Sequence, residues 1–271
     1  MRAPRMLSLA ALLLFASIDA PPAPEFNPGC IFPPGLTEER PIDRTCGLEG
    51  QTASAAHRAQ NRAKNNFCAP EPVLPVVFAD FANLQDAVRE RGIPFGGGGL
   101  PADRRDLHHL IESDNGELIG EGMRVRFTGY ILHARYSNTG KGETVNCKKR
   151  GAENNDIHLD LARKATAEPC DTITAEISPH RRPDAWTPAN LRDIGRRPVR
   201  VTGNLFFDAS HVPCTEERVS SPARASSWEI HPVYALDVCW HTTTGRCPAD
   251  DDSVWTPLDE WLNLEEDLDE P

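Results

Sequence analysis

Two runs in the second half of the chain decide the predicted fold: VRVTGNLFFD at residues 199–208 and SSWEIHPVYALDVC at residues 226–239. Both runs are rich in β-branched and aromatic residues, and both alternate between apolar and polar positions. This period of two is typical of a β-strand with one face against a core. In the second run, Glu229 and His231 share the face opposite Trp228. The two runs therefore predict a pair of strands that carries a carboxylate and an imidazole on its polar face.

Three more strands are predicted before this pair. MRVRFTGYILHARYS at residues 123–137, NDIHLDLAR at residues 155–163 and TITAEISPH at residues 172–180 all alternate in the same way. A short helix follows the third strand, with Thr187 as its N-cap and Pro188 at its first position. The predicted order is therefore three strands, one helix and two strands.

This order resembles that of OB-fold proteins over residues 122–239, and Gly129 lies in the first strand, where it would let the strand coil sharply. The resemblance implies a mainly β protein, built as a five-stranded OB-like Greek-key barrel and preceded by a small disulfide-linked helical region. It also implies ligand binding on the second and third strands and on the loops after the first and fourth, at residues 133–155 and 208–226. The chain is also similar to exported bacterial proteins. Neither resemblance implies a specific activity.

The first residues have the pattern of a secretory signal peptide. Arg2 and Arg5 give a basic start, and the apolar run at residues 7–15 is too short to span a bilayer. Cleavage is expected near Ala20, and no later run is long enough to cross a membrane. The sequence therefore predicts a secreted or periplasmic protein without a transmembrane segment.

The cysteine content agrees with export, because oxidising compartments preserve disulfides. The chain has 8 cysteines: Cys30, Cys46, Cys68, Cys147, Cys170, Cys214, Cys239 and Cys247. No closely spaced CxxC pair is present, which argues against a cysteine-ligated zinc site. Three cysteines precede residue 100 and five follow it, so full internal pairing requires at least one disulfide between the two parts. The pairing itself stays open.

The domain organisation follows from these segments. We expect a signal peptide at residues 1–20, a proline-rich leader with cysteines at 21–50, a small α-rich region at 51–121, the barrel at 122–240 and an acidic tail with a short amphipathic helix at 241–271. The tail carries most of the net charge of −11, because residues 250–271 hold ten carboxylates and neither Lys nor Arg. The remaining net charge is about −1, which would attract polyanions weakly.

Helices are predicted in the α-rich region. Ala55, Ala59 and Ala63 recur every four residues and predict a helix over residues 53–67 that packs through a narrow alanine seam. Asp80 is the expected N-cap of a second helix. A third, short helix is expected at residues 102–111.

The candidate site lies on the polar faces of the predicted strands and on the loop between the last two. Its ligand-binding candidates are Asp156, His158, Glu176, His211, Arg224, Glu229 and His231. Strands pair about 4.8 Å apart, so carboxylates and imidazoles of neighbouring strands can converge. Asp160 and His180 share the same faces.

Three functions fit this pattern. The first is a binding module for a ligand or protein partner, in which nucleic acid is disfavoured because the second and third strands carry no aromatic side chains for base stacking. The second is a metal-dependent hydrolase of the phosphoesterase kind, with His158, His231 and Glu229 as ligands of a divalent metal and catalytic residues unknown. No other cofactor is evident. The third is a structural envelope protein, in which the same side chains form ordinary cross-strand pairs.

Overall fold

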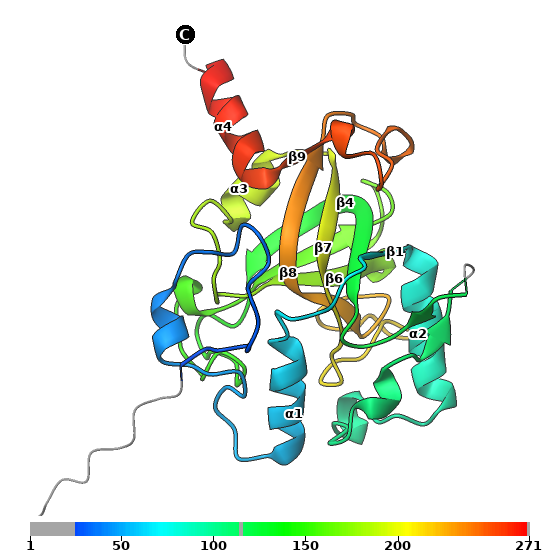
Figure 1. Ribbon diagram of the computed structural model, residues 1–271. Coiled ribbons are helices and arrows are strands. Elements are labelled where there is room, and N and C mark those ends of the chain that lie inside the picture. The colour runs from blue at the N-terminus through cyan, green and yellow to red at the C-terminus, as the bar shows by residue number, and fades with distance from the viewer. Residues whose placement is uncertain (1–24, 114–115, 270–271) are drawn as a thin grey trace, which may run out of the picture.

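The computed structural model describes residues 25–113 and 116–269, and the predicted signal peptide lies outside these described residues. Five strands form a closed barrel at the centre of the molecule (Figure 1). These strands are β4 (Arg124–Tyr136), β5 (Ile157–Ala162), β6 (Thr172–Ile177), β7 (Pro198–Phe207) and β8 (Trp228–Cys239). Their order around the barrel is β4, β5, β6, β8 and β7, and β7 pairs with β4 to close it. All neighbours are antiparallel except β6 and β8. The mainly β fold is thereby confirmed.

Alternate residues of the strands fill the barrel, as the period of two predicts. Val125, Leu159, Val201 and Ile230 belong to one apolar cluster and are fully buried. Trp228 is also fully buried, with its ring centroid 5.2 Å from that of Phe207. These side chains leave water on folding and supply much of the hydrophobic stabilisation.

Gly129 permits a close approach between β4 and β5. A Cβ at this position would lie 2.5 Å from the carbonyl oxygen of Ala162 and 2.6 Å from the ring of Phe127. A larger residue would therefore push these two strands apart.

The opposite faces of β5, β6 and β8 are not exposed to solvent, which corrects the expectation of an outward polar surface. His158, Glu176, Glu229 and His231 are all at most 5% exposed. Helix α1 (Ala55–Lys64) lies against this side of the barrel, below it in Figure 1. The candidate residues are therefore part of a buried polar interface.

Helix α1 begins after Ser54, whose hydroxyl accepts a hydrogen bond from the His57 backbone N–H. The predicted helix exists, but its buried side chains are Gln60, Asn61 and Lys64, so the expected alanine seam is not the packing face. Polar side chains dock this helix: Lys64 contacts Glu176 of β6, Gln60 donates to Asp208 after β7, and Asn61 donates to the Glu49 carbonyl before the helix.

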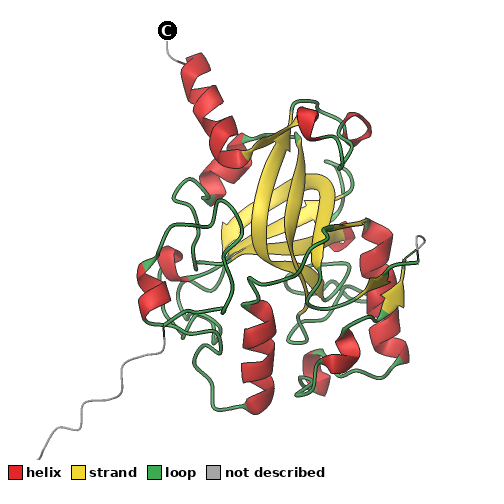
Figure 2. Cartoon of the chain, in the orientation of Figure 1, coloured by secondary structure: helices red, strands yellow, loops and turns green. Residues whose placement is uncertain are grey.

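The remaining helices and strands surround the barrel (Figure 2). Helix α2 (Phe78–Glu90) starts before Asp80, which is not the N-cap; its carboxylate instead accepts a hydrogen bond from the Val77 backbone N–H. Thr187 caps α3 (Pro188–Asp193), as predicted. The other strands are β1 (Leu74–Val76), β2 (Ile111–Glu112), β3 (Leu118–Ile119) and β9 (Trp255–Pro257), and the C-terminal helix is α4 (Leu258–Asp269).

Short 3-10 helices complete the described part of the chain. They are η1 (Pro41–Arg44), η2 (Gly96–Gly98), η3 (Arg105–Leu107), η4 (Ala152–Asn154), η5 (Pro169–Asp171), η6 (Thr244–Arg246) and η7 (Asp252–Val254). The helix expected at residues 102–111 is reduced to η3, and the chain continues into β2.

All eight cysteines form disulfides: Cys30–Cys68, Cys46–Cys147, Cys170–Cys214 and Cys239–Cys247. The pair Cys46–Cys147 is the bridge between the two parts of the chain that the cysteine distribution required. Four disulfides are typical of proteins from an oxidising environment. Among the described residues, no helix has the length and apolar character needed to cross a membrane.

Candidate functional site

A cavity of about 540 Å³ lies between α1, the outer faces of β5 and β6, and two loops. One loop follows β4 and the other follows β7, and they are the loops expected to bind a ligand. The lining includes His57, Gln60, Asn61 and Lys64 of α1, His158 of β5, Glu176 of β6, Arg135 to Asn138 and Glu143 to Val145 at and after the end of β4, and Asp208, Ser210, His211, Ser221, Pro222 and Arg224 after β7. These side chains are predominantly polar.

Among the described residues that line this cavity, Lys64 is the only lysine, and it contacts three carboxylates. Its Nζ lies 2.7 Å from Glu176 Oε2, 3.3 Å from Glu143 Oε2 and 3.5 Å from Asp156 Oδ2. Burial opposes the charge of Lys64, but the charges of Glu143, Glu176 and Asp156 outweigh it and hold the lysine pKa well above its ordinary value. Lys64 is therefore a buried ammonium ion.

Two of its partners, Asp156 and Glu176, ionise for the same reason. Burial favours the neutral acids, but the charge of Lys64 lowers the pKa of Asp156 and, together with the hydrogen bond from His158, holds the pKa of Glu176 well below its usual range. The floor of the cavity is therefore a charged network, which proteins rarely bury without pairing.

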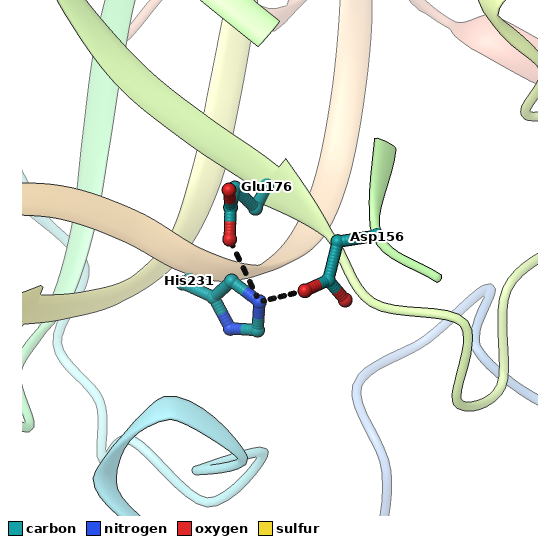
Figure 3. A group of neighbouring side chains, drawn as sticks. All are labelled: Asp156, Glu176 and His231. Carbon is teal, nitrogen blue, oxygen red and sulfur yellow. Dashed lines mark ion pairs between the residues drawn. The ribbon is translucent and has the colours of Figure 1, made fainter. Parts of the chain in front are cut away.

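His231 lies on β8 behind this network and points at both carboxylates (Figure 3). Its Nδ1 donates a hydrogen bond of 2.6 Å to the Lys64 carbonyl oxygen. Its Nε2 lies 3.6 Å from Asp156 Oδ2 and 3.5 Å from Glu176 Oε2. One ligand atom from each of these three residues lies within 4.8 Å of the others, so this buried group can hold a metal ion.

His158 is held between two carboxylates. Its Nδ1 lies 3.1 Å from Glu176 Oε1, and its Nε2 lies 2.9 Å from Asp160 Oδ1. Burial lowers the pKa of His158, but these two hydrogen bonds outweigh it and raise the pKa overall. Both ring nitrogens donate in the imidazolium form, so His158 has no free nitrogen for a ligand.

Glu229 and Arg224 form a second buried pair, with Arg224 Nη1 donating to Glu229 Oε2 at 3.1 Å. Burial and the neighbouring charges of Glu176 and Asp208 raise the pKa of Glu229 well above its ordinary value, against the opposing effect of Lys64 and Arg224. Glu229 therefore favours its neutral form, unlike Glu176 on the adjacent strand.

Asp208 and His211 form a hydrogen-bonded dyad on the loop after β7. His211 Nδ1 donates to Asp208 Oδ2 at 2.7 Å, and Gln60 Nε2 and the Ser210 backbone N–H donate to Asp208 Oδ1. Burial favours the neutral acid, but the His211 contact and its charge lower the pKa of Asp208. This arrangement leaves Nε2 as the free ring nitrogen of His211, whose side chain is 37% exposed.

The structure divides the candidate residues into two groups. His158, Glu176, His211 and Arg224 line the cavity. Asp156, Glu229 and His231 are fully buried.

The set expected to bind metal is not brought together, because His158 and Glu229 bond to other partners. Asp156 and Glu176 take their place beside His231. His180 is not part of the cavity lining. Its Nδ1 contacts Asp43 Oδ1 at 2.6 Å, away from the cavity.

Sequence reasoning missed Lys64, Glu143 and Asp208. The spacing of Gln60, Asn61 and Lys64 is helical, but a polar stripe on a helix is usually its solvent face. Asp208 and His211 are three residues apart directly after a predicted strand. This spacing is too common in loops to predict a hydrogen-bonded pair.

Comparisons with family models, with curated proteins and with solved structures gave no significant match for this chain. The function is therefore argued from the geometry of the site alone.

Proposed function

We propose that this chain is an exported binding module, built on an OB-like barrel, that takes a small hydrophilic ligand in the cavity beside α1. The OB-like assignment is supported by the strand order β4, β5, β6, β8, β7, by the parallel pairing of β6 with β8 and by α3 between β6 and β7. Export is supported by the basic and apolar start of the sequence and by the four disulfides.

One observation carries the binding proposal: the loops after β4 and β7 meet the outer faces of β5 and β6 around a single cavity of about 540 Å³. Ligand sites commonly have this size. Lys64 is paired with Glu176, His211 with Asp208, and Arg224 with the fully buried Glu229 behind the wall, whereas Ser137, Ser210 and Ser221 add hydroxyl groups to the wall. Such a lining suits a polar ligand with both donors and acceptors of hydrogen bonds.

Thermal-shift screening with sugars, nucleotides, amino acids and organic acids tests this proposal. We expect one class to raise the melting temperature, with 1:1 binding by calorimetry. His211→Ala should weaken that binding by about tenfold, which corresponds to ~1.4 kcal/mol. His241→Ala is the matched control, because His241 is partly buried and lies outside the cavity lining. Binding that is equal in both variants would place the ligand elsewhere, and no response to any class would favour the structural envelope protein.

A metal-dependent phosphoesterase is the second candidate, and the Asp208–His211 dyad is the observation that favours it. An imidazole with one nitrogen held by a carboxylate and the other free is the arrangement of a general base. In hydrolysis, His211 Nε2 would take a proton from a water molecule as the water oxygen attacks phosphorus. It would then give the proton to the alcohol oxygen that leaves as the P–O bond breaks.

This second candidate predicts hydrolysis of bis-p-nitrophenyl phosphate. His211→Ala should lower the rate by about 10²-fold or more, the usual contribution of a general base. Chelation should abolish the activity, and His241→Ala should leave it unchanged. Wild-type protein without such activity, both with and without added metal, would leave the binding module as the better proposal.

A further inference from the structure

The buried group of Asp156, Glu176 and His231 has an excess of hydrogen-bond acceptors. Within the described part of the chain, neither carboxylate oxygen of Asp156 takes part in a hydrogen bond, and His231 Nε2 has no hydrogen-bond partner. Asp156 and His231 are both fully buried, so water does not replace the missing partners from bulk solvent. Unpaired buried acceptors are costly, and a cation among them removes that cost.

The distances within this group fit shared coordination better than hydrogen bonding. His231 Nε2 lies 3.6 Å and 3.5 Å from the nearest oxygens of Asp156 and Glu176, which is too long for a good N–H···O bond. Two ligand atoms that each lie about 2.1 Å from a tetrahedral ion are roughly 3.4 Å apart. The two distances from His231 to the carboxylates, marked by dashed lines in Figure 3, are therefore close to the separation that one ion would impose, and all three ligand atoms lie within 4.8 Å of one another.

The outer contacts of these residues also match those of a metal centre. A metal-bound histidine usually donates its other ring N–H to a carbonyl or carboxylate, and His231 Nδ1 donates to the Lys64 carbonyl. A metal-bound carboxylate is usually held by a hydrogen bond, and His158 contacts the second oxygen of Glu176. These contacts orient the candidate ligand atoms before any ion arrives.

Lys64 places its ammonium group beside the same oxygens. Its Nζ lies 2.7 Å from Glu176 Oε2 and 3.5 Å from Asp156 Oδ2, where it neutralises part of their charge. It also lies 3.3 Å from Glu143, whose side chain is 18% exposed and lines the cavity. Lys64 can therefore stay paired with Glu143 while it leaves the other two carboxylates.

We propose that Asp156, Glu176 and His231 form a site for one divalent transition-metal ion, such as Zn²⁺ or Mn²⁺, and that the Lys64 ammonium competes with the ion for it. The ion enters from the cavity, whose lining includes Lys64, Glu143 and Glu176. The imidazole favours a transition metal over Mg²⁺ or Ca²⁺, which prefer oxygen ligands. Three protein ligands leave a fourth position open, as in catalytic zinc sites. The phosphoesterase candidate needs this site, whereas ligand binding in the cavity does not.

Metal titration of the full mature chain tests the site. After EDTA treatment and dialysis, wild-type protein should bind one Zn²⁺ or Mn²⁺ per chain by calorimetry, and Mg²⁺ at the same concentration should bind at least tenfold more weakly. Asp156→Asn should weaken Zn²⁺ binding by about 10²-fold, and Asp237→Asn, a control that changes a largely buried carboxylate paired with Arg200, should not weaken it.

The role of Lys64 has its own variant. Lys64→Met keeps the length of the side chain and removes the ammonium, so it should bind Zn²⁺ at least tenfold more tightly than wild type. Unchanged affinity would overturn the competition, and weaker affinity would show that Lys64 supports the ion.

A spectrum of wild-type protein avoids any dependence on the folding of variants. Co²⁺ bound by the three residues and one water should give the intense visible absorption of a four-coordinate ion, and Zn²⁺ should displace it. No stoichiometric binding of Zn²⁺, Mn²⁺ or Co²⁺ to wild-type protein would overturn the proposal and leave Lys64 as the permanent cation of the site. It would not affect a cavity ligand found by the thermal-shift screen.

Discussion

Glu229 and Glu176 lie on paired strands, yet their surroundings shift the two carboxyl pKa values in opposite directions. Lys64 contacts Glu176 directly and holds its pKa down, whereas burial and neighbouring carboxylates raise the pKa of Glu229. Two carboxyl groups in one network thus favour different protonation states. The network can then bury several acids without the repulsion that full ionisation would cause.

Glu229→Gln tests the neutral state of Glu229. A raised native pKa means that the stability of wild type relative to this variant falls as the pH rises from the ordinary Glu pKa, about 4.3, to the raised value. We expect the two proteins to differ by less than about 1 kcal/mol at pH 5, and the variant to be the more stable one at pH 8. Urea unfolding at both pH values measures this. A variant that is much less stable at pH 8 would show that Glu229 is ionised in its pair with Arg224.

The partners of His158 favour its charged form, whereas the surroundings of Glu229 favour its neutral form. Its pKa is raised by contacts with Asp160 and Glu176, so its contribution to stability is present below the ordinary His pKa of about 6.5 and is lost as the pH rises through the raised value. Asp160→Asn should lower the His158 pKa, because it replaces a charged acceptor with a neutral amide. NMR titration of the imidazole Hε1 resonance measures the shift, with the exposed Asp86→Asn as the control. An unchanged pKa would mean that Asp160 does not interact with His158 in solution.

At the scale of elements, alternation predicted the strands and their core faces but not what covers the other faces. The pattern around His158 and Glu176 is the same for a wet face and for one that meets a polar helix. Only the position of α1 distinguishes them, and that position depends on contacts distant in sequence, such as Lys64 with Glu176. The helix itself was predictable from its period, but its buried face was not, because a polar stripe ordinarily faces water.

Asn61→Ala tests how α1 is held. Asn61 Nδ2 donates to the Glu49 carbonyl at 2.8 Å, and its Oδ1 accepts from Thr144 Oγ1 at 3.3 Å. Loss of both bonds should cost about 1–3 kcal/mol of unfolding free energy, measured by urea unfolding. Arg62→Ala, on the next residue, removes only an exposed ion pair with Glu49 and should cost less than ~1 kcal/mol. Equal losses would show that the polar face of α1 is not what docks it.

At the scale of the whole molecule, the cysteine distribution required a bridge between the two parts of the chain, and Cys46–Cys147 provides it. The particular partners could not be predicted, because pairing depends on which loops the fold brings together. This bridge joins the segment before α1 to the loop after β4, whose Glu143 and Thr144 contact α1. It therefore ties one wall of the cavity to the helix that covers the barrel.

Removal of this disulfide should be more costly than removal of Cys239–Cys247. The two bridges close loops with sequence separations of 101 and 8 residues. Loop-closure entropy then predicts losses of about 4–5 kcal/mol for Cys46→Ala with Cys147→Ala, and about 2–3 kcal/mol for Cys239→Ala with Cys247→Ala. Burial of the cysteines does not by itself predict a larger loss for the long loop, because Cys46, Cys239 and Cys247 are at most 1% exposed and Cys147 is partly buried. Non-reducing urea unfolding measures both losses. A larger loss for the short loop would mean that local packing, and not restriction of the unfolded chain, determines how much each disulfide contributes to the free energy of unfolding.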